Sequence, residues 1–136
     1  MMLEVETNPY TCSAEAMEAP LRRMLGMSNS LYEGMRNGKD EKFMEQSIDQ
    51  LLEFAQRQFA CEEELQRHEH YDGLPAHQFE HENLVEWLKQ MRVHLIAGTL
   101  PSPPLEIAEY LRDWLYEHVL RSDQAFLSEV GAHERW

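Results

Sequence analysis

Residues 44–65 read MEQSIDQLLEFAQRQFACEEEL, and this segment is the most informative about the fold. Apolar residues recur in it every three or four positions, which is the period of an α-helix with one buried face. The stripe consists of Met44, Ile48, Leu51, Ala55, Gln58, Glu62 and Leu65. We therefore predict a long amphipathic helix that carries a glutamine and a glutamate on its inward face.

Three further segments have the same helical period. Their stripes are Met17, Leu21, Met24, Ser28, Leu31 and Met35, then His77, His81, Leu84, Leu88, Met91 and Leu95, and finally Ile107, Leu111, Leu115, His118, Ser122 and Phe126. Turn-forming residues separate the segments at 37–38, 71–75 and 98–104. Alternation with a period of two is scarce, so strands are not expected. The pattern predicts an all-α fold, an antiparallel up-and-down four-helix bundle, with residues 1–136 as one domain.

The charge balance argues against several classes of partner. The 136 residues include 25 acidic and 12 basic side chains, a formal net charge of −13. Nucleic acid and anionic membranes attract clustered Lys and Arg, so neither is expected as a partner. No apolar run approaches the roughly 20 residues that cross a bilayer, and the first residues do not look like a signal peptide. We expect a cytoplasmic protein in which Cys12 and Cys61 are free thiols.

Polar residues interrupt the inward stripes on three of the four helices. Glu62, His77, His81 and His118 occupy positions that apolar neighbours define as buried. Burying a carboxylate and three imidazoles is costly unless they pair with one another or bind a metal. His77 and His81 are four residues apart, so both rings project from one helical face. Imidazole and carboxylate ligands together favour iron, zinc or a related transition metal over magnesium or calcium. A single buried His or Glu, by contrast, is more often a core residue whose hydrogen bonds are satisfied by its neighbours.

These residues occur within motifs that resemble the hemerythrin family. The segment 58–63, Gln-Phe-Ala-Cys-Glu-Glu, is similar to the motif His-Phe-x-x-Glu-Glu with its first histidine changed. The segment 77–81 is similar to His-x-x-Glu-His, and His118 with Asp123 resembles His-x-x-x-x-Asp. The likeness extends from about residue 17 to about residue 127 and implies a single hemerythrin-like domain.

The resemblance implies a diiron site with named ligands. One iron would be held by His77, His81 and His118, and Glu62 and Asp123 would bridge it to a second iron, where dioxygen binds. Asp123 poses a geometric difficulty, because five residues of ideal helix place it about 140° around the axis from His118. A site that uses both residues needs a local distortion of the helix or a position between neighbouring stripes.

Both histidines of the second iron are absent. Gln58 stands at one ligand position and Leu21 at the other, so we expect at most weak or vestigial ligands there. An amide oxygen is a poor ligand beside an imidazole, and Gln58 is expected to hydrogen-bond Glu62 instead. One iron per chain is therefore favoured. A weak diiron pair, or zinc, or no metal at all, are the alternatives.

The expected function follows from this altered site. We predict a non-haem iron protein that binds or senses O2, another small diatomic molecule or the cellular redox state. The alternative is a metal-poor interaction module that binds a partner protein or forms a homodimer. A weak oxidase or peroxidase is less favoured, because Glu62, Glu63 and Tyr116 are the only evident proton donors.

Overall fold

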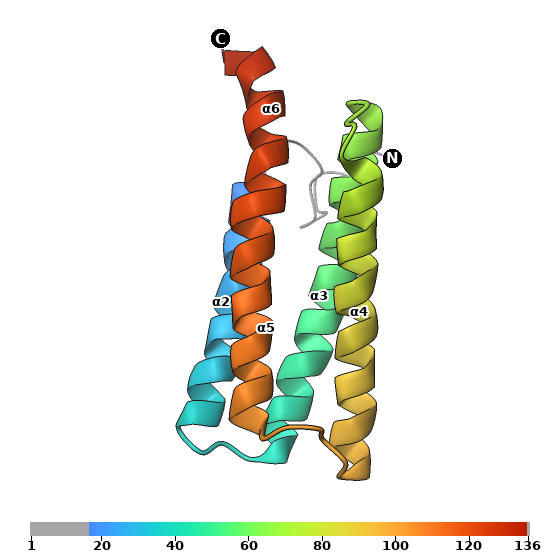
Figure 1. Ribbon diagram of the computed structural model, residues 1–136. Coiled ribbons are helices and arrows are strands. Elements are labelled where there is room, and N and C mark those ends of the chain that lie inside the picture. Colours follow the sequence, from blue (N-terminus) through green and yellow to red (C-terminus); the bar gives the residue numbers. More distant parts are fainter. Residues whose placement is uncertain (1–16, 136) are drawn as a thin grey trace, which may run out of the picture.

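The computed structural model describes the backbone of residues 17–135 and the side chains of residues 17–129. Its elements are α2 (Glu18–Arg36), α3 (Glu41–His68), α4 (Leu74–Ala97), α5 (Pro104–His118), the π-helical turn η1 (Val119–Asp123) and α6 (Gln124–Arg135). The last three form one continuous rod, and this rod runs alongside α2, α3 and α4 (Figure 1). The predicted all-α four-helix bundle is confirmed, and the described residues contain no strand.

Each helix buries the stripe predicted for it. α3 packs against α2 and α4, and α2 also packs against α5. Every residue of the first three predicted stripes is buried. The fourth stripe departs from the prediction near its end, where Ser122 is only half-buried while Asp123 is completely buried. The π-helical turn causes this change, because its extra residue rotates the helix and brings Asp123 inward.

Short turns with local capping connect the helices. The side chain of Asp40 caps α3 by accepting a hydrogen bond from the backbone N–H of Phe43 at 2.9 Å. α2 is followed by Gly38 and α4 by Gly98, with φ of 82° and 75°, a conformation that other residues adopt only at a cost. These turns fix the antiparallel order of the helices.

Two further expectations concerned membrane-spanning helices and the oxidation state of the cysteines. None of the helices in residues 17–135 is both long and apolar enough to span a membrane. The prediction of free thiols is wrong for Cys61, which is disulfide-bonded in the structure. Helical periodicity reports which way a cysteine faces, and gives no sign of whether it is oxidised. Cys12 lies outside the described residues.

Candidate metal centre

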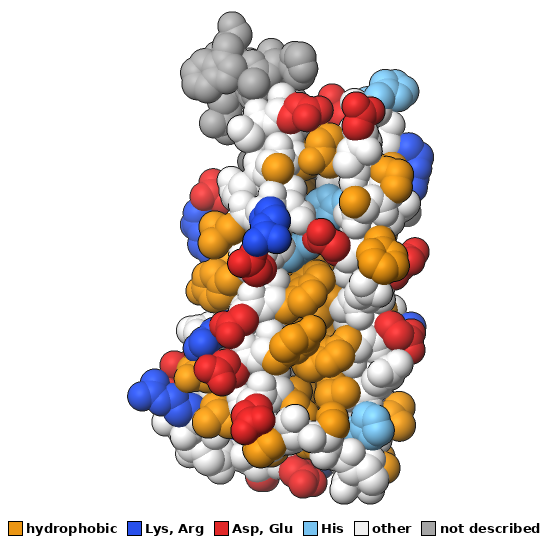
Figure 2. Space-filling view, viewed as in Figure 1, with side chains coloured by type: hydrophobic (Ala, Val, Ile, Leu, Met, Phe, Trp, Pro, Cys, Tyr) orange, Lys and Arg blue, Asp and Glu red, His pale blue; other side chains and the backbone are white. Residues whose placement is uncertain are grey.

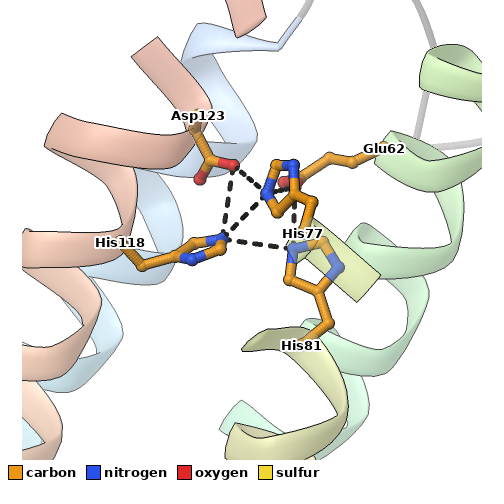
Figure 3. Close-up of side chains that lie close together, drawn as sticks. All are labelled: Glu62, His77, His81, His118 and Asp123. Carbon is orange, nitrogen blue, oxygen red and sulfur yellow. Dashed lines mark hydrogen bonds and ion pairs between the residues drawn. The ribbon is translucent and has the colours of Figure 1, made fainter. Parts of the chain in front are cut away.

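Five buried side chains converge near one end of the bundle, and we call them the candidate metal centre (Figure 3). They are Glu62 from α3, His77 and His81 from α4, His118 from α5 and Asp123 from η1. One ligand atom from each lies within 4.8 Å of all the others, and no residue of the set is more than 3% exposed. The structure thus brings together all five side chains singled out from the sequence.

The three imidazoles meet through the same ring nitrogen. The Nε2 atom of His118 lies 3.1 Å from Nε2 of His77 and 3.1 Å from Nε2 of His81. Two ligands at right angles on a metal with bonds of about 2.1 Å lie about 3.0 Å apart. The nitrogen atoms therefore have the spacing of adjacent ligands on a single ion.

The Nδ1 atom of each imidazole, on the side of the ring away from the centre, contacts another side chain. Nδ1 of His81 lies 2.7 Å from a carboxylate oxygen of Glu63, and Nδ1 of His118 lies 2.6 Å from one of Glu80. A carboxylate accepts the Nδ1 proton, which leaves Nε2 with its lone pair directed at the centre. Lone pairs that face one another at 3.1 Å repel unless a cation or a proton lies between them.

The carboxylates of the centre lack ordinary partners. Oε1 of Glu62 and Oδ1 of Asp123 are buried, and their close polar neighbours are imidazole Nε2 atoms, which donate a hydrogen bond only when they are protonated. Oδ1 of Asp123 lies 2.8 Å from Nε2 of His77, a contact that is a hydrogen bond only when that nitrogen carries a proton. Unpartnered buried oxygens are costly, so this donor set fits a bound cation better than a polar core.

Aromatic rings fix the orientation of two imidazoles. The ring of Phe59 stacks on His81 with centroids 3.7 Å apart and planes 3° from parallel. The ring of Trp114 stacks on His118 at 4.9 Å and 12°. With one face against an aromatic ring and Nδ1 against a carboxylate, each imidazole is restricted in both rotation and tilt.

Protons occupy the centre when no metal is bound. Burial raises the pKa of Glu62 to about 7, with a further contribution from the charge of Asp123. Burial alone would lower the pKa of His81, but hydrogen bonds to Glu62 and Glu63 outweigh it and raise that pKa to about 9. Burial lowers the pKa of His77. A positively charged His81 thus compensates the carboxylates that a metal ion would otherwise neutralise.

The π-helical turn resolves the difficulty posed by Asp123. The backbone N–H of Gln124 donates to the carbonyl of Val119, five residues earlier, instead of to the carbonyl four residues earlier. One extra residue per turn brings positions five apart to the same side of the helix. Oδ1 of Asp123 consequently lies 3.3 Å from Nε2 of His118. The spacing had left two options, a local distortion of the helix or a site between neighbouring stripes. The structure contains the local distortion.

Comparison with known proteins gives this centre a family context. The model of the Hemerythrin HHE cation binding domain matches residues 15–130. The chain belongs to the hemerythrin family. Bacteriohemerythrin from Stenotrophomonas maltophilia (strain R551-3) is 27% identical over 133 residues, which cover 98% of this chain and 85% of that protein. Bacteriohemerythrin from Clostridium acetobutylicum is 24% identical over 110 residues, covering 78% of this chain and 84% of that protein. No solved structure matches the chain significantly.

The two positions that lack a hemerythrin-type histidine contain ordinary core contacts. Leu21 is 2% exposed and belongs to the hydrophobic core. The amide of Gln58 donates to Oε2 of Glu62 at 3.1 Å, as expected, and contacts the sulfur of Met17 at 3.6 Å. Gln58 thus lies against Oε2 of Glu62, whereas His77 and His81 lie near Oε1.

Several residues around the centre were not predicted from the sequence. Gln66 and Glu80 contact His77 and His118 through Nδ1, and Ser122 donates to the same oxygen of Glu80 at 2.8 Å. Gln66 could have been found, because it follows Glu62 by four residues and continues the inward stripe. Glu80 could not, because its side chain is 40% exposed and lies beside that stripe.

Proposed function

We propose that this chain is a non-haem iron protein that holds one iron and binds or senses O2 or another small diatomic molecule. The proposed ligands are Glu62, His77, His81, His118 and Asp123. Three imidazoles and two carboxylates suit iron, and bound iron supplies reversible diatomic binding and one-electron chemistry. The family relationship and the converging donor atoms support an iron protein.

One observation carries the preference for a single iron. A carboxylate that bridges two metals must offer one oxygen to each. Oε1 of Glu62 lies near the histidines, 3.3 Å from Nε2 of His81, whereas Oε2 accepts the amide proton of Gln58. Met17 contacts Gln58 at 3.6 Å, and Leu21 and Gln58 offer no imidazole at the two positions where the resemblance places ligands of a second iron.

The surroundings fit a small ligand better than a large one. The site residues are at most 3% exposed, so only a small molecule could reach the centre without rearrangement. A hollow of about 270 Å³ lies over His118, lined by Glu80, Trp114, Glu117, Arg121 and Ser122. Figure 2 shows histidine atoms in a recess on this face, flanked by acidic and basic side chains. An iron held by these five side chains would supply the site at which a diatomic molecule binds.

Metal content is the test. Protein purified without an affinity tag from iron-supplemented cells should contain one iron per chain, and its ferrous form should give a coloured adduct with nitric oxide. The double variant Leu21→His with Gln58→His should take up a second iron. The matched variant Leu21→Asn with Gln58→Asn, polar but without imidazole, should stay at one.

Two outcomes would overturn the proposal. Two irons in the unaltered protein would mean that Gln58 or water suffices at the second position. No iron would remove the proposed function and favour the alternative, an interaction module that binds a partner protein or a second copy of itself.

A further inference from the structure

The three imidazoles of the candidate metal centre have unequal partners behind them. His81 and His118 face carboxylates, Glu63 and Glu80, at 2.7 and 2.6 Å. His77 faces the amide of Gln66 at 2.5 Å. The two carboxylates reach solvent, with side chains 21% and 40% exposed, whereas Gln66 is completely buried. One imidazole of the three therefore has a neutral and wholly enclosed partner.

Chemistry fixes which amide atom faces His77. An imidazole that binds a metal through Nε2 carries its proton on Nδ1 and must donate it. The amide of Gln66 therefore presents its oxygen, since a 180° rotation of the group exchanges its oxygen and nitrogen. In the opposite orientation, that oxygen is buried without a hydrogen-bond partner.

Gln66 also fixes where His77 lies. Its backbone carbonyl, in the last turn of α3, accepts the N–H of Tyr71 at 2.9 Å, and this ties it to the turn that leads into α4. The N–H of His77 bonds the carbonyl of Gly73 at 3.0 Å, in the first turn of α4. The contact between the two side chains thus joins the ends of two helices directly at the centre.

The identity of the partner affects how strongly an imidazole donates electrons. A carboxylate draws the Nδ1 proton toward itself and makes the ring a stronger donor, which favours the more highly charged oxidised metal. A neutral amide attracts the Nδ1 proton much less and therefore strengthens the ring as an electron donor much less. Four carboxylates already surround the centre, Glu62 and Asp123 within it and Glu63 and Glu80 behind it. A fifth at position 66 would be buried and would further favour the oxidised ion.

We propose that Gln66 is a positioning residue that makes His77 the weakest electron donor of the three histidines and thereby keeps the iron easier to reduce. The inference rests on the proposed iron site. The ferrous state, which binds diatomic molecules, is favoured by a neutral partner on one histidine.

The midpoint potential of the iron, measured by spectroelectrochemical titration, tests the proposal. Gln66→Glu should lower the potential, and the reciprocal exchange Glu63→Gln should raise it. The control Gln124→Glu adds the same charge at an exposed position beside Asp123, away from any Nδ1 atom, and should shift the potential much less. Equal shifts for Gln66→Glu and Gln124→Glu, or no shift for Gln66→Glu, would overturn the inference.

A neutral variant keeps the test decisive if a buried charge prevents folding. Gln66→Met is similar in length but cannot accept the Nδ1 proton. It should weaken ferrous iron binding about 10- to 100-fold and raise the potential, while the metal-free protein melts as before. Unchanged affinity and potential would contradict the role of Gln66. Unaltered protein that contains no iron would instead remove the proposed function, and this inference with it.

Discussion

At the residue scale, the orientation of each imidazole decides how well the centre binds a metal. Phe59 covers one face of His81, and its own side chain is only 3% exposed. Phe59→Leu should free that ring to tilt and weaken metal binding by roughly tenfold, an effect comparable to losing an outer-shell partner. Isothermal titration with Co²⁺ measures this change.

Phe54 provides the matched control on the same helix. It is 5% exposed, and the guanidinium carbon of Arg23 lies 5.0 Å from the centre of its ring. Each exchange to leucine should lower the free energy of unfolding of the metal-free protein by about 1–2 kcal/mol, because both remove buried volume. Equal metal affinities in the two variants would show that stacking on His81 is irrelevant to binding.

The five residues of the centre could be predicted because they interrupt apolar stripes. Glu62 and His118 stand at positions that neighbouring leucines define as buried, and this is visible in one sequence. The outer partners depend on which atoms face one another across helices, and helical period carries no such information. Glu80 illustrates the limit, because a partly exposed glutamate resembles any solvated one until its contact with His118 is known.

At the element scale, η1 aligns His118 with Asp123 through a single extra residue. A π-helical turn is less favourable than the α-helix it interrupts and is often retained at functional sites. Leu120, in the middle of the turn, is 67% exposed. Deleting it should restore a regular helix, leave the packing of Phe126 in register and preserve or raise Tm. Metal affinity should change by less than about tenfold, because Asp123 would then follow His118 by four residues and stay on the same face of the helix.

A deletion elsewhere in the same rod separates these effects. Removing Glu109, exposed and within the regular part of α5, would rotate His118 away from the core and should unfold the bundle. Thermal melting by circular dichroism and Co²⁺ titration distinguish the two variants. If deletion of Leu120 is as damaging as deletion of Glu109, the turn does not act as a single inserted residue.

The sequence predicts the regular helices well but gives little indication of the π-helical turn. Every position in the stripes predicted over α2, α3 and α4 is buried, because an α-helix has one constant period. An inserted residue breaks that period only locally, and the apolar pattern continues on either side of it. The awkward spacing of His118 and Asp123 was the single indication of η1, and it was informative only once both were considered ligands.

At the scale of the whole molecule, stability depends on what neutralises the buried carboxylates. Folding raises the pKa of His81 from 6.5 to about 9, where hydrogen bonds to Glu62 and Glu63 outweigh burial, and burial raises that of Glu62 from 4.5 to about 7. Both groups therefore bind protons more strongly in the folded state. Their stabilisation is greatest at low pH and is lost as pH rises through about 7 for Glu62 and about 9 for His81.

Metal binding should weaken this pH dependence, because an ion displaces those protons. Between pH 5.5 and pH 8, chelated protein should lose at least about 4 °C in Tm, the change that roughly 1 kcal/mol produces in a domain of this size. Protein saturated with Co²⁺ should lose less, so the metal-dependent increment in Tm grows with pH. Glu62→Gln, which removes the group that titrates near pH 7, should flatten the curve of the chelated form over this range. A chelated protein whose Tm is constant or rises from pH 5.5 to pH 8 would mean that protons do not occupy the centre in the absence of metal.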